Sequence, residues 1–436
     1  MPTLLSGRRI FAAVAVALTI GGLLTPQIFS QTRLTGNDAV VAIAARSTFP
    51  NYKTTLKALS DMGTRQMIDS IPTESNTIAV AWLVRELGAM GYATTIFGTY
   101  RSVYCTKIGS RAPDSMYILC AHLDGVGGFS GNCDDDASGT ALVVEAARAF
   151  AGAAVSTRCS IRFFLTNGHE AGYKGAIEYR DNRHDLQGKE NPPGSRQFPE
   201  PVWLGLINQD LILYDHGNPA GPVQIPQASI RVNYCPWSYA ESSLYMAQQF
   251  IAIDKVIFVG YPAVIPAGGG GLGAFDAGQF ANYCPVISPE EGGGDAGYIA
   301  NPLHHDDADT YETYSEADFA LAFSAVQREV GEMAFLTQTT ITGNTPAKSE
   351  PPVANAAPLS SSWSLLTRQH ELTISASSRG THTVKLSSLD GTPIMRRIGQ
   401  GRMSYSLRTE SVGAGLYVVT INADGNVMQK SVVIAR

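Results

Sequence analysis

A histidine and an aspartate stand at the end of an apolar segment, where they could bind a metal ion. The stretch YILCAHLDG carries His122 and Asp124 two positions apart, so both side chains point to the same side of an extended backbone. A metal-bound imidazole usually donates its other N–H to a carboxylate, so Asp124 is placed to orient His122. Taken alone, a hydrogen-bonded surface pair is the simpler interpretation of this motif.

Three consecutive aspartates, Asp134, Asp135 and Asp136, follow in GNCDDDASGTALVVEAARAF. Adjacent carboxylates repel one another unless a cation or the N-terminus of a helix neutralises them. The competing interpretation is a solvated acidic turn that caps the following helix. That interpretation is a serious one for Asp135 and Asp136, but it does not account for all three residues.

Further candidate ligands stand at the ends of later segments. TNGHEAG puts Glu170 after the most apolar strand-like segment, where a lone carboxylate is costly unless it is bound. INQDLILYD does the same with Asp210, and NPLHHDDADTYETY carries His304 and His305 on a polar loop. Each of these residues alone is better explained as structural. Together, two histidines, two aspartates and a glutamate at strand ends form the ligand set of a pair of divalent metal ions.

The segments that must position these residues alternate between apolar strands and helical patterns. Residues 37–100 carry helical periodicity, as in NTIAVAWLVRELGAMGY, and strands and helices then alternate over 103–337. This order predicts an α/β domain over 37–337. We expect a three-layer sandwich whose mostly parallel central sheet is covered by helices on both faces, with ligands gathered where strands end.

The C-terminal part of the chain has a different composition. Residues 338–366 are rich in Pro, Ala and Ser, which is typical of a linker. Residues 367–436 alternate apolar and polar side chains between Asp-Gly turns, which predicts a small all-β sandwich. We therefore expect the two folded parts to move independently.

The N-terminal residues 1–30 are typical of an export signal. Arg8 and Arg9 precede a short apolar run that ends near Pro26 and Ser30. A membrane span needs about 20 apolar residues, so an uncleaved anchor is the alternative and no stable insertion is expected after signal removal. The signal predicts a secreted or cell-surface protein.

Overall composition excludes some functions. The net charge of −6 and pI near 5.8 provide no basic field for nucleic acid. The 6 cysteines show no CxxC spacing, so a metal knot is not expected. In an exported chain, about one to three disulfides are expected instead, but sequence does not determine their pairing.

From about residue 53 to 337, these motifs resemble the two-zinc aminopeptidases. That family includes bacterial leucyl aminopeptidases and glutamate carboxypeptidases, and the glutaminyl cyclases are its single-zinc relatives. The resemblance rests on LSDMGTRQ, HLD, DDDASGTALVVEAAR, GHEAG, NQDLILYD and HHDDADT. It implies a metallopeptidase that acts on peptides or protein N-termini, with two Zn(II) ions per chain or another divalent metal.

The resemblance also implies roles for individual residues. His122 and Asp210 would hold one zinc, Glu170 and His305 the other, and Asp134 would bridge them. His305 is preferred to His304 because it stands four residues before the Asp-Thr of the family pattern HTxxDT. Asp124 would orient His122. A cis peptide bond is expected between Asp134 and Asp135.

His169 stands where the family has the glutamate that acts as general base. An imidazole with an unperturbed pKa near 6.5 could accept the proton of a zinc-bound water, although two nearby dications disfavour the imidazolium form. We expect His169 to serve as base or to position the water. Alternatives are a metal-binding homologue that binds peptides but hydrolyses them weakly or not at all, a glutaminyl cyclase-like acyltransferase, or a His169 that supports or binds one zinc.

Two further features bear on specificity and export. Tyr283, Glu290 and Glu291 are candidates for the substrate wall or for binding the free amine, and AFD replaces the SDH element of relatives. The C-terminal GLYVVTI and QKSVVIAR resemble type nine secretion sorting domains. This resemblance implies a partner in the secretion machinery, and a generic adhesive or spacing module is the alternative.

Overall fold

The computed structural model divides the chain into two compact units, residues 1–347 and 348–436. The predicted signal segment 1–30 lies outside the described residues. The residues that the structure describes are 31–126, 128, 131–214, 228–257, 263–266, 269–272, 275–293, 301–344, 362–368, 371–388, 393–408, 415–423 and 426–434.

An eight-stranded sheet forms the centre of the first unit, in the order β11-β10-β12-β9-β6-β8-β5-β4. Four neighbouring pairs are parallel, namely β10–β11, β12–β9, β9–β6 and β6–β8. The prediction of an α/β fold with a mostly parallel sheet is therefore confirmed. The strands are β4 (Thr94–Phe97), β5 (Ser102–Lys107), β6 (Ala112–His122), β8 (Cys159–Thr166), β9 (Val202–Asn208), β10 (Ala228–Tyr234), β11 (Ala263–Val264) and β12 (Val286–Gly293).

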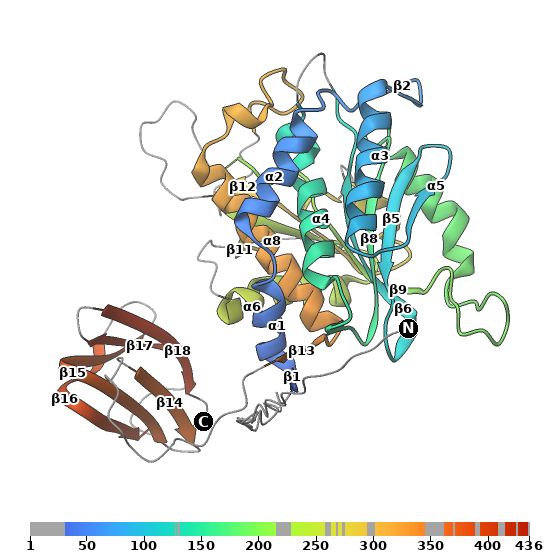
Figure 1. Cartoon of the computed structure of the whole chain (residues 1–436). Coiled ribbons are helices and arrows are strands. Elements are labelled where there is room, and N and C mark those ends of the chain that lie inside the picture. Colours follow the sequence, from blue (N-terminus) through green and yellow to red (C-terminus); the bar gives the residue numbers. More distant parts are fainter. Residues whose placement is uncertain are drawn as a thin grey trace, which may run out of the picture. The chain divides into compact units, whose positions relative to one another are not determined.

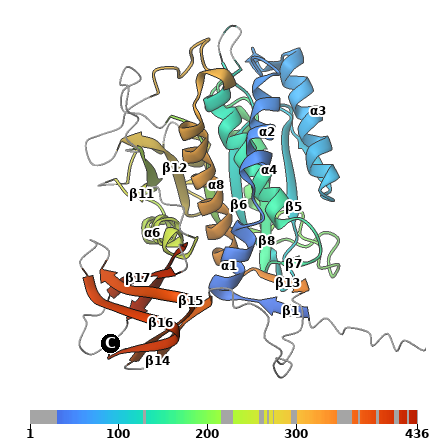
Figure 2. The same cartoon turned by 60° about the vertical axis from the view of Figure 1, so that its left-hand side comes forward.

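Helices cover both faces of this sheet (Figures 1 and 2). Strand β6 shows why: Ile118 and Cys120 belong to one hydrophobic cluster, while Leu119 and Ala121 belong to the other, as expected from side chains that alternate along a strand. One face packs against α1 (Gly36–Ala44), α2 (Phe49–Ser60), α3 (Glu74–Ala89), α4 (Gly139–Phe150), α6 (Ala240–Ile257) and α8 (Glu316–Leu336). The opposite face packs against α5 (Lys174–Arg183) and α7 (Asp276–Phe280).

Local sequence fixes where the long helices begin. Ser315 caps α8, because its side chain accepts a hydrogen bond from the Asp318 N–H while the Asp318 carboxylate accepts one from the Ser315 N–H. Thr73 caps α3 and Thr48 caps α2 in the same way through single side-chain bonds. These caps satisfy N–H groups that the first turn leaves unpaired.

Two small antiparallel sheets complete the first unit. One contains β1 (Gln31–Leu34), β13 (Thr340–Asn344) and β7 (Val155–Ser156), and the other β2 (Met67–Ile68) and β3 (Ile71–Pro72). Strand β13 lies inside the predicted linker 338–366, so that prediction begins too early. The reason is that β13 pairs with segments that are distant in the sequence. Its first three residues are β-branched, but so short a segment does not by itself distinguish a strand from a linker.

The second unit is all-β. Strand β15 is the longest of its five antiparallel strands and pairs with β14, β16 and β17, while β17 also pairs with β18. Leu372, Ile374, Val384 and Leu386 contribute to its core. The strands are β14 (Ser362–Arg368), β15 (Glu371–Ser388), β16 (Pro393–Arg408), β17 (Gly415–Ala423) and β18 (Asn426–Ile434).

All six cysteines are buried free thiols, so the disulfides expected of an exported chain are not formed. Cys105 and Cys120 illustrate the reason, because they belong to hydrophobic clusters on opposite faces of the sheet. Burial raises the pKa of Cys105 to about 12 and that of Cys159 to about 11. These two residues are protonated core residues.

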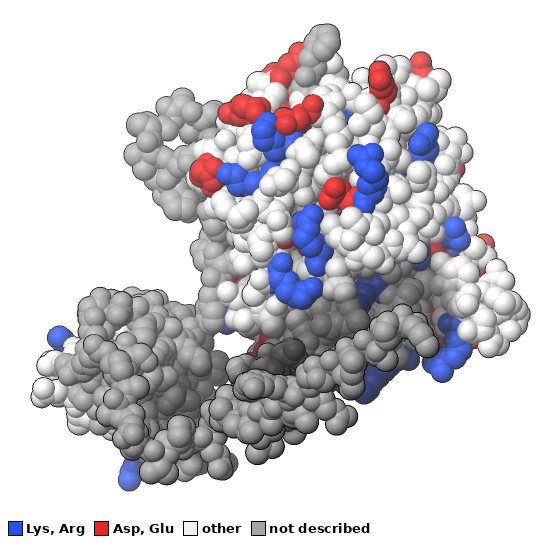
Figure 3. Space-filling view, viewed as in Figure 1, with Lys and Arg blue, Asp and Glu red and all other residues white. Residues whose placement is uncertain are grey.

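On the face shown in Figure 3, acidic side chains gather toward the top, where basic ones lie among them, and the charged side chains lower down are mainly basic. Within the described part of the chain, no helix is both long enough and apolar enough to cross a membrane.

Candidate metal centre

The candidate ligands converge at the carboxyl ends of three neighbouring parallel strands. His122 is the last residue of β6, His169 and Glu170 follow β8, and Asp210 follows β9. Parallel neighbours present their carboxyl ends at the same edge, which is where ligands bind in open α/β sheets. The structure thus brings together residues that lie far apart in the sequence, such as His122 and Asp210, which are 88 positions apart.

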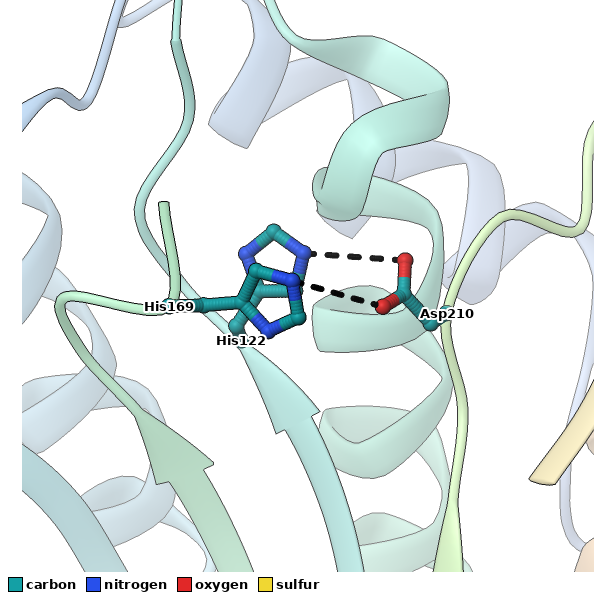
Figure 4. A group of neighbouring side chains, drawn as sticks. All are labelled: His122, His169 and Asp210. Carbon is teal, nitrogen blue, oxygen red and sulfur yellow. Dashed lines mark ion pairs between the residues drawn. The ribbon is translucent and has the colours of Figure 1, made fainter. Parts of the chain in front are cut away.

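One group contains His122, His169 and Asp210 (Figure 4). The Nε2 atom of His122 lies 3.6 Å from Oδ1 of Asp210, and Nε2 of His169 lies 3.9 Å from Oδ2 of the same carboxylate. The two imidazole rings stack with their centroids 3.9 Å apart and their planes 10° apart. Both histidines therefore direct the same nitrogen toward one carboxylate.

A second group surrounds Asp135, whose Oδ2 atom lies 3.1 Å from Nε2 of both His304 and His305. His305 also lies 3.3 Å from Oε2 of Glu170. The other Asp135 oxygen, Oδ1, lies 3.2 Å from Nε2 of His122. The carboxylate of Asp135 thus faces both groups.

The structure corrects the expected role of Asp134. Its Oδ1 atom accepts hydrogen bonds from the backbone N–H groups of Ile212 and Leu213, and its Oδ2 atom accepts one from the Asn301 amide. Asp134 therefore holds neighbouring loops together, and Asp135 occupies the position between the two groups. The cis peptide bond correspondingly lies one residue later than expected, between Asp135 and Asp136.

Asp136 caps helix α4, as the competing interpretation suggested, but it is buried rather than solvated. Its carboxylate accepts hydrogen bonds from the N–H groups of Gly139 and His122, so it ties the start of the helix to the end of β6. A Cβ atom at Gly139 would approach Asp136 Oδ1 to 2.5 Å and the Gln209 carbonyl to 2.7 Å, which explains the glycine.

Asp124 orients two parts of the centre. The Nδ1 atom of His122 lies 3.1 Å from the Asp124 main-chain oxygen but 3.7 Å from its carboxylate. The carboxylate instead accepts hydrogen bonds from the N–H groups of His169 and Glu170, at 3.1 and 3.2 Å. The predicted orienting residue thus acts on His122 through its backbone and on the His169-Glu170 turn through its side chain.

Sequence reasoning missed two supporting residues. Arg65 is fully buried and donates hydrogen bonds to the carbonyl oxygens of Leu59, Leu123, Gly131 and Asn132. It therefore fixes the loops on either side of the centre. The motif LSDMGTRQ, which contains this arginine, was the available signal.

The second missed residue is Asp276, the first residue of α7. Its buried carboxylate lies 3.3 Å from Nδ1 of His169 and accepts a hydrogen bond from the Thr166 hydroxyl. Asp276 is the aspartate of AFD, the sequence that replaces the SDH element of relatives, so the signal lay in that replacement.

The donor atoms fit a divalent cation. Within the described part of the chain, His122 Nε2, Asp135 Oδ2 and Glu170 Oε1 are buried and make no hydrogen bond. Two ligands of one tetrahedral zinc, each about 2.1 Å from the ion, lie about 3.4 Å apart, close to the separations in both groups. Imidazole nitrogen with carboxylate oxygen is a donor set that zinc accepts.

The pKa shifts of residues in the centre also indicate a site suited to a cation. The nearby carboxylates of Asp135 and Glu170 raise the pKa of His305 to about 10. Burial raises the pKa of Asp135, but the neighbouring imidazoles outweigh burial and hold it well below its usual value. Burial and the His122 ring lower the pKa of His169, yet the carboxylates of Asp276 and Asp210 give a net increase. The centre therefore favours positive charge.

A cleft of about 480 Å³ opens onto this centre. Phe275 and Leu211 form apolar parts of its wall, and Arg231 and Glu290 are charged lining residues whose Nε and Oε1 atoms lie 3.5 Å apart. Burial raises the pKa of Glu290 to about 7. Of the three residues predicted for the substrate wall, only Glu290 lines this cleft.

The other two predicted wall residues have structural contacts. Tyr283 packs against Trp203 and His184, with ring centroids 6.4 and 5.0 Å away. Glu291 is buried and accepts a hydrogen bond from the Tyr214 N–H.

Comparison with known proteins supports a peptidase. Residues 104–195, which include His122, Asp135, His169 and Glu170, match the model of peptidase family M28. The LapA aminopeptidase of Legionella pneumophila has a similar structure, with a TM-score of 0.54 and 16% identity over 70% of this chain and 77% of that chain. LapB of the same organism gives 0.52 and 14%, over 70% and 76%.

A glutaminyl cyclase of Porphyromonas gingivalis is also similar, with a TM-score of 0.46 and 16% identity over 65% of this chain and 97% of that chain. At these identities the Legionella structures show a shared fold, and the lower cyclase score does not bear on activity. The family match and the fold confirm the predicted resemblance to the zinc aminopeptidases.

Proposed function

We propose that this chain is an exported zinc aminopeptidase that hydrolyses N-terminal residues from peptides at a two-metal centre. The observation that carries this proposal is the position of Asp135. Its Oδ1 faces His122 at 3.2 Å and its Oδ2 faces His305 at 3.1 Å. A carboxylate with one oxygen toward each donor group is well placed to contact two metal ions.

The remaining donors divide between the two positions. His122 and Asp210 would hold the first metal, Glu170 and His305 would hold the second, and Asp135 would contact both. When bound, two zinc ions would polarise the scissile carbonyl and lower the pKa of a water molecule.

The chain's own residues would bind and orient the peptide. Phe275 and Leu211 offer apolar contacts to the first side chain of the peptide. Glu290 lines the cleft beside Arg231 and offers a carboxylate for the free α-amine. A charge-assisted hydrogen bond of this kind would favour peptides with a free N-terminus.

Hydrolysis also requires a group that accepts a proton from the attacking water. His169 occupies the sequence position of that group, and Nε2 is its nitrogen that faces Asp210. A single lone pair serves either as proton acceptor or as metal ligand. An imidazole beside two dications resists becoming positively charged, so it accepts a proton less readily than a carboxylate does. This replacement favours the alternative of a weakly active peptide-binding homologue.

Glutaminyl cyclisation is less well supported. The relatives that perform it use one zinc, whereas this chain brings together candidate donors for two positions. If purified protein converts N-terminal glutamine peptides and leaves aminoacyl-arylamides intact, cyclisation replaces hydrolysis as the proposed function.

Metal analysis combined with an aminoacyl-arylamide panel tests the proposal. We expect about two zinc ions per chain, release of free amino acids, and loss of release with a chelator that zinc restores. His184→Ala is a matched control because this histidine lies outside both donor groups, and it should behave as the wild type. A metal-loaded protein that cleaves no substrate in the panel would reject the aminopeptidase.

Export is a separate part of the proposal. The signal-like residues 1–30 and the sorting-like C-terminal unit support delivery to the cell surface or medium. Deletion of residues 368–436 should block delivery and leave hydrolysis by the purified protein unchanged. Normal delivery of the truncated chain would reject the sorting role.

A further inference from the structure

One wall of the cleft carries an arginine and a glutamate that face each other across two antiparallel strands. Arg231 of β10 stands directly opposite Glu290 of β12 in the strand register, so both side chains lie on the same face of the sheet. Both residues line the cleft that opens onto the candidate metal centre. Burial is the main cause of the raised pKa of Glu290, and the Asp210 carboxylate adds to it. The pair therefore lies within electrostatic reach of a candidate metal ligand.

Asn233 holds the two charged groups in place. It stands two positions after Arg231 on β10, and its buried side chain therefore lies on the same face. Its amide N–H donates a hydrogen bond to Oε1 of Glu290 at 2.6 Å, and its Oδ1 atom accepts one from Nε of Arg231 at 3.1 Å. The Arg231 Nε and Glu290 Oε1 atoms lie 3.5 Å apart. Asn233 thus fixes the spacing of the positive and the negative group.

The outer edge of the Arg231 guanidinium is available to a ligand. Asn233 uses its Nε atom, and neither terminal nitrogen donates a hydrogen bond within the described part of the chain. The side chain is 24% exposed, and Arg231 is the only lysine or arginine among the described residues that line the cleft. A planar guanidinium can bind a carboxylate through two parallel hydrogen bonds. This wall therefore offers a site for a carboxylate of the substrate.

The spacing of the two charges selects the kind of substrate. Glu290 is the proposed partner of the free α-amine, so a carboxylate on Arg231 has to lie close to that amine. The side-chain carboxylate of an N-terminal aspartate or glutamate does so, because only a short methylene chain separates it from the α-carbon. The C-terminal carboxylate of a peptide lies beyond the scissile bond and farther from the amine. Phe275 and Leu211, which also line the cleft, would pack against the methylene groups.

We propose that Arg231 determines substrate specificity by binding the side-chain carboxylate of the first residue, so that this chain prefers peptides that begin with aspartate or glutamate. The proposal rests on the proposed aminopeptidase activity and names its substrate class. In the bound peptide each charge meets its opposite, since the ammonium group faces Glu290 and the carboxylate faces Arg231. Asn233 acts as a positioning residue for both.

Pairs of substrates with the same shape test the proposal on zinc-loaded, full-length protein. Arylamine release compares the glutamyl- with the glutaminyl-arylamide, and the aspartyl- with the asparaginyl-arylamide. We expect kcat/KM for each acid to exceed that for its amide by about 10- to 100-fold, the range typical of hydrogen bonds between charged groups. Equal values for acid and amide would overturn the proposal.

Arg231→Met removes the guanidinium and keeps an unbranched apolar side chain. Because this variant also leaves Glu290 without its cationic neighbour, the acid-to-amide ratio of kcat/KM is the readout rather than the absolute rate. We expect the ratio to fall to near unity, whereas His184→Ala should keep the wild-type ratio. An unchanged ratio in Arg231→Met would mean that another group binds the carboxylate, and the proposal would be wrong.

A dipeptide with a neutral first residue tests the other carboxylate that Arg231 could bind. If Arg231 bound the C-terminal carboxylate, leucyl-leucine would be cleaved better than leucyl-leucinamide, and Arg231→Met would remove that preference. We expect the ratio of these two substrates to be the same in wild type and variant. A preference for the free dipeptide that disappears in Arg231→Met would overturn the proposal.

Calorimetric binding of peptides separates failure of this proposal from failure of the aminopeptidase. If no arylamide is cleaved, tighter binding of a peptide that begins with glutamate than of its glutamine counterpart, lost in Arg231→Met, would leave the carboxylate site standing without the activity. If the leucyl-arylamide is cleaved but the acids are no better than their amides, the aminopeptidase stands and this proposal fails. Absence of both cleavage and binding preference would reject both.

Discussion

Two groups of buried carboxylates in this chain have opposite surroundings. In the candidate metal centre, Asp135 and Asp210 lie within 4 Å of imidazole nitrogens. On α8, Glu329 and Glu332 are also buried, but their carboxylate oxygens make no hydrogen bond within the described part of the chain, and burial raises both pKa values well above normal. Burial of acids alone therefore does not make a metal site. In the candidate metal centre the acids converge with imidazoles, and that convergence distinguishes it from the acids of α8.

The largest expected effect is a difference in metal binding between the Asp135→Asn and Asp134→Asn variants. Asp135→Asn should abolish hydrolysis and weaken binding of both metals by more than about 100-fold, because it removes the carboxylate that faces both donor groups. Asp134→Asn should retain both metals, since an amide oxygen can still accept hydrogen bonds from Ile212 and Leu213. Elemental analysis of both proteins measures this. Retention of two metals by Asp135→Asn would contradict the assignment.

A smaller effect separates the two histidines of the late loop. Both lie 3.1 Å from Asp135, but only His305 also approaches Glu170. We expect His305→Ala to weaken the second zinc equivalent at least about tenfold more than His304→Ala. Metal titration of the two variants side by side measures the difference, and a larger loss with His304→Ala would reverse the assignment.

The cleft wall should affect substrate binding more than turnover. Glu290→Gln removes a negative charge that could bind the α-amine. We expect KM to rise about tenfold with little change in kcat, because a hydrogen bond to a charged group contributes about 1.5–3 kcal/mol. Tyr283→Phe is the matched control, since Tyr283 lies away from the cleft. Steady-state kinetics on one arylamide would show the effect, and an unchanged KM in Glu290→Gln would remove Glu290 from amine binding.

The smallest expected effect concerns the pH dependence of stability, and it tests a buried acid of α8 instead of one in the candidate metal centre. The folded-state pKa of Glu332 is raised, so its proton is retained in the folded chain and released from the unfolded chain above about pH 4.3. Wild-type stability should therefore fall as pH rises, by up to about 1.4 kcal/mol per pH unit for such a group until the folded carboxyl ionises.

Glu332→Gln should remove that part of the pH dependence. The gain in unfolding temperature over the wild type should be larger at pH 8 than at pH 5. The exposed Glu241→Gln on α6 should show no such difference. An equal gain at both pH values for Glu332→Gln would mean that Glu332 is already ionised in the folded protein.

The sequence predicted the parts of the centre that depend on regular structure. His122, Glu170 and Asp210 follow parallel strands, and the strand-end rule alone places them together. The choice among three consecutive aspartates failed by one position, because Asp135 and Asp136 adopt non-helical backbone angles inside the turn Cys133–Ser138. Side-chain directions there follow no simple period.

Contacts between distant segments were beyond the reach of sequence patterns. Asp276 approaches His169 across 107 positions, and Arg65 binds carbonyl groups up to 67 positions away. Both residues stand in recognisable motifs, LSDMGTRQ and AFD, but neither motif shows which groups its side chain contacts. Strand β13 was likewise assigned to the linker, because it is recognisable as a strand only from its pairing with β1 and β7.

A zinc-loaded crystal structure with anomalous data at the zinc edge tests the central claim most directly. The account predicts two anomalous peaks per chain. One peak should be bonded to His122 and Asp210, and the other to Glu170 and His305, with Asp135 between them. A single peak, or an Asp135 carboxylate bonded to only one zinc, would contradict it.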